Sequence, residues 1–199
     1  FDSNVTHSLF TSEYNNRRIE CDEGLSIINE NYPEINSFRD CNEELLIGLK
    51  SKMTDNVFRR SLYAVKEIKR VIQACTALDK GDIETLGKLM FETHQGLSVD
   101  YEVSCDELDF LVNQAKNIPE VVGARLMGGG FGGCTINLVK RSAKSSFEND
   151  VKSAYKTRFG IDLEVYAVDI SDALGASSEV AAVAYTLVDD GVDLAMIAQ

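Results

Sequence analysis

The sequence predicts an α+β fold, in which helices pack on a small, mainly antiparallel sheet. Up to Pro119, apolar residues recur at steps of three and four, which is typical of amphipathic helices. The pattern then changes to short, glycine-bounded runs rich in β-branched residues, which favour strands. A helical stretch and one more strand-like run follow. A block of helices followed by strand, strand, helix and strand indicates an α+β domain rather than a parallel sheet with alternating helices.

The helices are predicted from the spacing of apolar residues and from their capping signals. The clearest begins at Asp55 and has one apolar face, whereas its Arg59 and Arg60 are expected to be available to water. Ser104, three residues before Glu107, predicts a capping box at the start of a later helix. The helices are predicted over residues 11–29, 42–52, from 55 to the stop at Gly81, from the cap at Asp82 to about Gly96, from Ser104 to Pro119, and over 142–159.

Three strands are predicted, over residues 121–127, 134–139 and 163–170. The first two enclose a run of glycines, so they form a hairpin or a more elaborate loop. The expected domain covers residues 1–173. The tail over 174–199 has small, alternating apolar residues that suit either a helix or an added strand, and it is left unassigned.

Composition limits the class of partner. The net charge of -12, with no stripe of Lys or Arg, argues against nucleic acid but not against nucleotides, which backbone N–H groups can bind. No apolar stretch approaches the roughly 20 residues that span a bilayer. Five cysteines without a C-x-x-C pair favour reduced thiols and a cytoplasmic location. Because the chain opens on Phe1, we expect it to be part of a longer protein.

The strongest motif is the glycine loop between the first two predicted strands. It contains Gly128, Gly129, Gly130, Gly132 and Gly133, interrupted only by Phe131. So many glycines weaken a fold unless the backbone needs unusual angles or a close approach, and successive N–H groups in such a loop can bind an anionic oxygen. No Gly-Lys-Ser or Gly-Lys-Thr follows, and no long helix opens at its end, so it is neither a P-loop nor a dinucleotide fingerprint.

The surroundings of this loop resemble the galactokinase family, within the superfamily of homoserine, mevalonate and phosphomevalonate kinases. The similar segments, in order, are NVTHSLFTSEYNNRRIEC, FRDCNEEL, DYEVSCDELDFLV and GARLMGGGFGGCTINLV. The fold that the resemblance implies is the ferredoxin-like carboxy-terminal domain of these kinases.

The resemblance implies transfer of the γ-phosphoryl group of ATP to the anomeric hydroxyl of galactose. Tyr14, in the SEYN motif, would hydrogen-bond the sugar, although a lone tyrosine is more often a packed helix residue. The glycine loop would lie near the phosphates, with Phe131 bracing it. ATP and Mg²⁺ would serve the complete enzyme, and we expect neither to bind tightly to this chain alone.

The remaining candidate residues have structural interpretations. Cys134 is expected to be a small buried hydrophobe, and His7 and His94 have no metal-ligand spacing. Arg17 and Arg18, next to acidic residues, are interpreted as surface ion pairs, although either could reach a phosphate. Arg125 could face the site or solvent. We predict no metal ligand and no catalytic residue in this chain.

The amino-terminal half of such a kinase would carry the sugar motif, the serine-rich nucleotide loop and the aspartate base. None of these motifs occurs here, so the isolated chain is predicted to be inactive. Alternatives are an N-acetylgalactosamine kinase, a non-catalytic galactokinase-like sugar sensor, and a structural module whose glycine loop only makes a turn.

Overall fold

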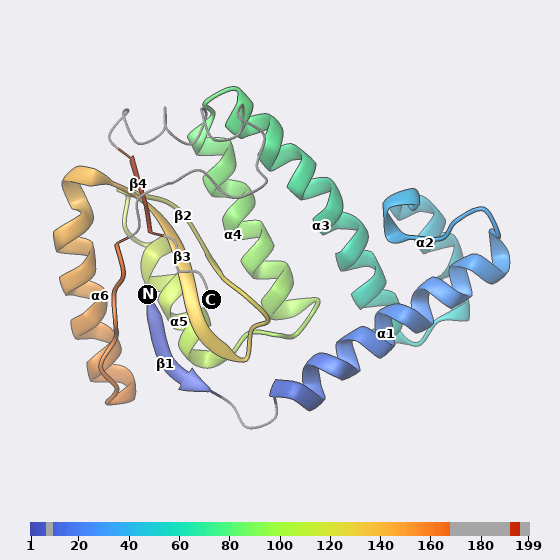
Figure 1. Cartoon of the computed structure of the whole chain (residues 1–199), viewed down its shortest axis with the longest axis horizontal. Helices are drawn as coiled ribbons and strands as arrows, with labels where there is room; N and C mark the ends of the chain where they lie inside the picture. The colour runs from blue at the N-terminus through green and yellow to red at the C-terminus, as the bar shows by residue number, and fades with distance from the viewer. Residues whose placement is uncertain (7–9, 168–191, 196–199) are drawn as a thin grey trace.

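The computed structural model describes residues 1–6, 10–167 and 192–195, and it confirms the α+β prediction (Figure 1). The helices are α1 (Phe10–Asn31), α2 (Glu43–Leu49), α3 (Asp55–Asp79), α4 (Ile83–Val99), α5 (Asp106–Lys116) and α6 (Lys144–Phe159). The strands are β1 (Asp2–Thr6), β2 (Val121–Leu126), β3 (Gly132–Lys140) and β4 (Val192–Ala195), and short 3-10 turns occupy Phe38–Asp40, Lys50–Lys52 and Arg141–Ala143.

Strand β3 is the centre of an antiparallel sheet. It pairs with β2 along one edge, and along the other edge with β1 near its start and β4 near its end. Glu164 bridges to Asp2 on β1. The predicted strand over 163–170 is therefore represented by this single bridge, and its last three residues lie outside the described part of the chain. Strand β4 shows that four residues of the unassigned tail form an added strand.

The two faces of the sheet bury separate cores, because neighbouring residues of a strand point to opposite sides. Leu138 packs with residues of α3 and α4, whereas Val139 packs with α5 and α6. Tyr155 of α6 is fully buried in the second core, and its hydroxyl donates to the carbonyl of Ser3 at 2.8 Å. This core therefore ties β1 to the carboxy-terminal helices.

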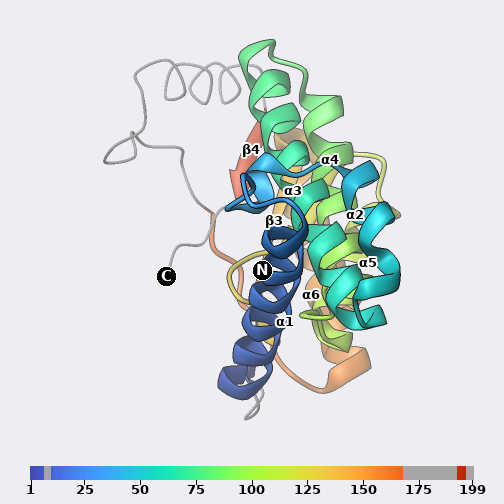
Figure 2. The same ribbon diagram turned by 90° about the vertical axis from the view of Figure 1, so that its right-hand side faces the viewer.

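Helices α1 and α2 extend away from the sheet, to which α3 and α4 connect them (Figure 1). When the molecule is turned by 90°, α1 lies nearest the viewer, in front of α3 (Figure 2). The α1–α3 contact is close, because a Cβ added at Gly24 would lie 2.0 Å from the Ser61 hydroxyl oxygen. In the described part of the chain, every helix is too short or too polar to cross a membrane.

The helix starts predicted at Asp55 and after Asp82 are correct, whereas the one predicted at Ser104 is wrong. Asp82 caps α4 by accepting the N–H of Thr85 at 3.0 Å, as predicted. The capping box at Ser104 was wrong: Cys105 occupies the N-cap, and the hydroxyl of Ser104 donates to Asp109 instead. Thr54 caps α3 through the N–H of Val57.

Candidate functional site: the glycine loop and its supports

The glycine loop has the backbone angles that its composition predicted. Gly128, Gly130, Gly132 and Gly133 all have positive φ, between 78° and 118°. Phe131 also has a positive φ, of 57°, which is uncommon for a bulky residue and shows that its neighbours hold the loop in place. A simple two-residue hairpin turn does not require this many left-handed residues.

The loop also makes the close backbone approach for which glycine is suited. A Cβ added at Gly130 would lie 2.0 Å from the carbonyl oxygen of Val103, in the connection between α4 and α5. The N–H of Phe131 donates to that same oxygen at 2.7 Å. In the described part of the chain, no N–H of Gly128, Gly129 or Gly130 donates to a backbone carbonyl. Those donors are thus suited to an anionic ligand.

Tyr14 lies near the start of α1 and is 49% exposed. It is therefore not packed in a core, which was the structural alternative for a lone tyrosine. Tyr14 precedes Arg17 by three residues, so the two side chains share one face of the helix. Tyr14 is also close enough to Tyr101 to raise the pKa of that phenol, although burial of Tyr101 is the larger cause.

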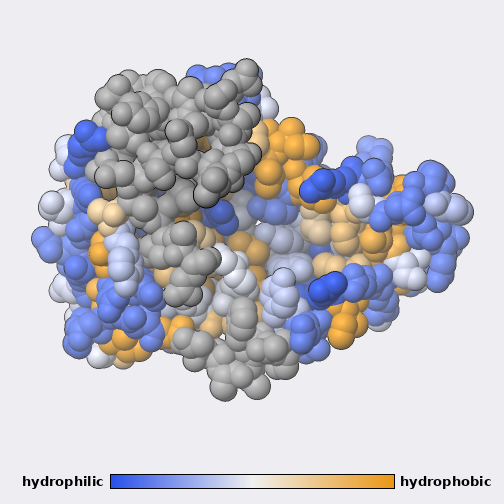
Figure 3. Space-filling view, in the orientation of Figure 1, coloured by the Kyte–Doolittle hydropathy of each residue, from blue (hydrophilic) through white to orange (hydrophobic). Residues whose placement is uncertain are grey.

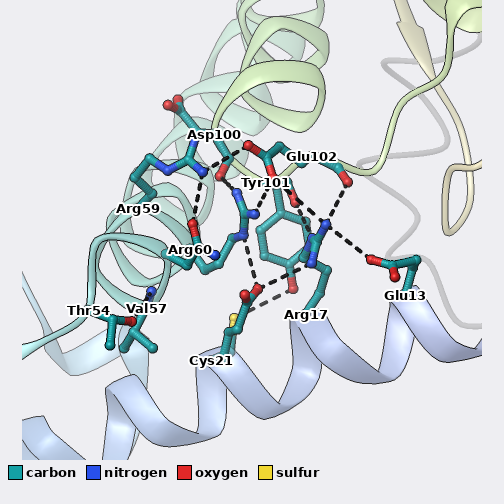
Figure 4. A network of polar contacts seen from close by, with 12 residues as sticks. Glu13, Arg17, Cys21, Thr54, Val57, Arg59, Arg60, Asp100, Tyr101 and Glu102 are labelled. Carbon is teal, nitrogen blue, oxygen red and sulfur yellow. Dashed lines mark hydrogen bonds and ion pairs between the residues drawn. The ribbon is translucent and has the colours of Figure 1, made fainter.

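Residues 100–105, which we call the bridging loop, join α4 to α5 and link Tyr14's helix to the glycine loop. Three arginines hold it, and we call them the arginine cluster: Arg17 from α1, and Arg59 and Arg60 from α3 (Figure 4). Arg17 donates to the carbonyls of Tyr101 at 2.7 Å and Glu102 at 3.2 Å. The bridging loop thus contacts α1 and α3 on one side and Gly130 and Phe131 on the other.

Arg60 and Glu102 form the centre of this cluster. The side chain of Arg60 is only 1% exposed, and it donates to the backbone carbonyl of Asp100 and to the carboxylates of Glu20 and Glu102, at 3.1 and 2.5 Å. Arg59 reaches the other oxygen of Glu102 at 2.8 Å. The hydrogen bond from Arg60, supported by the one from Arg59, holds the pKa of Glu102 below its ordinary value.

Two arginines that were expected at the surface are buried. Arg60 was expected to face water, but it is buried because two carboxylates and a backbone carbonyl surround it. Arg17 forms the expected ion pairs, at 3.5 Å from Glu13 and 3.4 Å from Glu20, but it is buried rather than at the surface, and it also donates to two backbone carbonyls. Arg18 does form the expected exposed pair, at 3.9 Å from Asp22. Sequence reasoning therefore missed the arginine cluster, whose only visible signals were two adjacent arginine pairs.

The other candidate residues take structural positions. Cys134 is half-buried, and burial raises the pKa of its thiol, which disfavours the nucleophilic thiolate. Arg125 donates to the carbonyl of Leu126 at 3.3 Å. His7 lies outside the described residues.

His94 is a satisfied structural histidine, as predicted. Its Nδ1 accepts the backbone N–H of Leu126 at 3.2 Å, just before the glycine loop, and its Nε2 lies 3.1 Å from Asp109. Asp109 also accepts the hydroxyls of Ser98 and Ser104. This network fixes the end of β2 relative to α4 and α5.

Acid is expected to weaken this network. Burial would raise the pKa of Asp109, but hydrogen bonds from His94 and two serines outweigh burial and hold that pKa below its usual value. A carboxyl whose pKa is lowered by folding stabilises the fold above its unfolded pKa of about 3.9, and that stabilisation is lost as pH falls through the folded pKa. Urea unfolding from about pH 6 to about pH 2 should show this loss. Asp109→Asn should flatten the curve, and an unchanged slope would contradict the assignment.

A separate groove of about 690 Å³ lies between α2, the 3-10 turn before it, and α3. Ile47 and Ile72, which line it, are strongly exposed, and the space-filling view shows apolar surface in this region of the molecule (Figure 3). None of its lining residues belongs to the glycine loop or to the first turns of α1. The groove is thus not part of the candidate site.

The comparisons with known proteins agree with the fold and the loop. The family model "GHMP kinases C terminal" matches residues 57–157, which is half of the chain. A galactokinase of Roseiflexus sp. (strain RS-1) is 38% identical over 174 residues, covering 87% of this chain and 44% of its own length. A galactokinase of Thermotoga maritima is 40% identical over 173 residues, covering 87% of this chain and 47% of its own.

A solved structure, that of Lactococcus lactis galactokinase complexed with galactose, superposes with a TM-score of 0.76 and 31% identity. The match covers 81% of this chain and 42% of that one. The chain therefore belongs to the GHMP kinase family, and it corresponds to the carboxy-terminal domain of these kinases. Within that family it is similar to the carboxy-terminal half of galactokinases, and it spans about half the length of the curated relatives it matches.

Proposed function

We propose that this chain is the carboxy-terminal part of a galactokinase, which transfers the γ-phosphoryl group of ATP to the anomeric hydroxyl of galactose. The observation that carries the proposal is the glycine loop, held in left-handed conformations against the bridging loop that also contacts the helix of Tyr14. The galactose complex of a 31% identical galactokinase supports galactose as the sugar. Residues 1–173 form the kinase domain in this proposal.

In this proposal Tyr14 donates or accepts a hydrogen bond at the sugar, since its side chain is half-exposed at the start of α1. The N–H groups of Gly128 to Gly130 lie near the transferred phosphates and offset their negative charge. Positioning of this kind is the main task of a protein in phosphoryl transfer.

We assign the general base and the Mg²⁺ ligands to the amino-terminal half. In the part of the chain that the structure describes, no three His, Cys, Asp or Glu side chains converge as a metal site would require. In this proposal the isolated chain is inactive, and galactose and ATP are used only in the complete protein.

The test is ADP release from MgATP and galactose. We expect none from the purified chain alone and activity when it is mixed with, or fused to, the amino-terminal half of a related galactokinase. Activity of the chain alone would refute the assignment of the base, and silence of the fusion would refute the kinase proposal. In the active form, Tyr14→Phe should raise the KM for galactose about tenfold, as loss of one hydrogen bond predicts.

The same assay separates the alternatives. Turnover of N-acetylgalactosamine in preference to galactose would identify the related kinase instead. Sugar and nucleotide binding by the fusion without ADP release would identify a sensor. Arg18→Gln, which removes an exposed ion pair on the same helix as Tyr14, is the matched control and should leave the KM unchanged.

A further inference from the structure

Five consecutive backbone carbonyls, from Val99 to Val103, accept hydrogen bonds from two different sources. The first four accept from the arginine cluster: Val99 from Arg59, Asp100 from Arg60, and the next two from Arg17. The fifth, that of Val103, accepts from the N–H of Phe131 in the glycine loop. One continuous stretch of backbone is therefore hydrogen-bonded to α1 and α3 along most of its length and to the glycine loop at its end. The position of the two helices thus determines where the glycine loop is held.

Glu102 is the turning point of this stretch. Its φ of 53° is left-handed, which is costly for a residue with a side chain and persists only where contacts enforce it. Arg59 binds one oxygen of its carboxylate at 2.8 Å and Arg60 binds the other at 2.5 Å, while Arg17 donates to its backbone carbonyl and lies 3.9 Å from the oxygen that Arg60 binds. With Glu102 held in this conformation, the next carbonyl, that of Val103, meets the glycine loop.

We propose that Glu102 and Arg60 are positioning residues of the phosphoryl-transfer site: they set the bridging loop so that Val103 fixes the glycine loop relative to Tyr14. Neither residue need touch a substrate, because the effect passes through the Val103–Phe131 hydrogen bond. The consequence for catalysis rests on the proposed function, whereas the consequence for the position of the glycine loop does not.

The alternative is that the arginine cluster only fastens α1 to α3. The contacts separate the two roles, because Arg60 binds Glu20 of α1 and Glu102 of the bridging loop through different nitrogens. Replacing Glu102 with Gln removes the charged grip on the bridging loop and leaves the Arg60–Glu20 contact between the helices in place. Glu102→Gln is therefore the informative variant. Because the Glu102 side chain is partly exposed, we expect the protein to remain folded when it is replaced.

The first readout is amide hydrogen exchange, followed by mass spectrometry on peptides covering 99–104 and 127–134. Glu102→Gln should speed exchange in both peptides about tenfold, while residues 121–126 of β2 remain as in the parent. Arg18→Gln, an exposed pair on α1, is the control and should change neither peptide. Unchanged exchange at 127–134 in folded Glu102→Gln protein would overturn the proposal, whether or not the protein is a kinase.

The second readout is kinetic and uses the fusion with an amino-terminal half. Glu102→Gln should raise the KM for MgATP about tenfold, because the loop that meets the phosphates is displaced. A purely structural role would lower the active fraction, and thus kcat, without moving the KM. Faster exchange with an unaltered KM would overturn the positioning role in catalysis.

A third variant tests whether both changes act on the same contact. Gly130→Ala would place a Cβ 2.0 Å from the Val103 oxygen, whereas Gly128→Ala has nothing within 4 Å and a similar positive φ. Gly130→Ala should therefore speed exchange at 127–134 more than Gly128→Ala. Combined with Glu102→Gln it should add little, since the contact is already broken. Fully additive effects would show that Glu102 acts elsewhere and would overturn the proposal.

Discussion

Replacing Gly87 with alanine is expected to lower the free energy of unfolding by about 3 kcal/mol, at the upper end of overpacking effects. Gly87 lies on α4, where that helix crosses β2. An added Cβ would lie 2.1 Å from the carbonyl oxygen of Val122, and one added at Gly123 would lie 2.5 Å from the Cα of Gly87. Both obstacles are backbone atoms, so no side chain can rotate away and the helix must move off the sheet.

Gly48→Ala is the matched control for this change. Gly48 is also a helical glycine, in α2, but a Cβ there would meet nothing within 4 Å. Alanine should stabilise that helix by up to about 1 kcal/mol. Urea unfolding of both variants measures the difference. A neutral result for Gly87→Ala would mean that α4 and β2 do not approach as closely as the structure shows.

Arg60→Gln is expected to cost about 3 kcal/mol of stability, because it breaks the ion pairs of a buried arginine. The change would remove the cation that lies closest to both Glu20 and Glu102, leaving Arg17 and Arg59 as their remaining partners, and it would remove the donor to the Asp100 carbonyl. Because the Arg60 side chain is almost fully buried, the loss should depend little on salt.

Arg18→Gln should cost less than about 0.5 kcal/mol, and that small effect should vanish in salt, since both members of its pair are exposed. Arg60→Lys should recover only part of the loss, because one ammonium cannot reproduce the planar fork of a guanidinium. Urea unfolding at low and high salt compares the three variants. Equal costs for Arg60→Gln and Arg18→Gln would contradict the buried position of Arg60.

The helices and the central hairpin could be predicted because their causes are local. The apolar spacing of α3 and the cap at Asp82 are properties of neighbouring residues, and the structure confirms both. Strand β1 could not be predicted, because DSNVT has no alternation of apolar and polar residues. It is a strand because β3 pairs with it and because Phe1 is buried between α5 and α6. The capping box predicted at Ser104 does not form, because the Ser104 hydroxyl donates a hydrogen bond to Asp109 instead.

The candidate site likewise has one part that could be predicted from the sequence and another that could not. The sequence by itself determined the glycine loop, since five glycines in six positions weaken a fold unless the backbone there needs positive φ angles or a close approach. Only the tertiary structure decided the fates of Arg59 and Arg60, which are adjacent and chemically identical. One side chain is 38% exposed and the other 1%, because the carboxylates and carbonyls around Arg60 come from α1 and the bridging loop, about 40 residues away in either direction. No local pattern distinguishes the two arginines, since partners so distant in sequence meet only when the chain has folded.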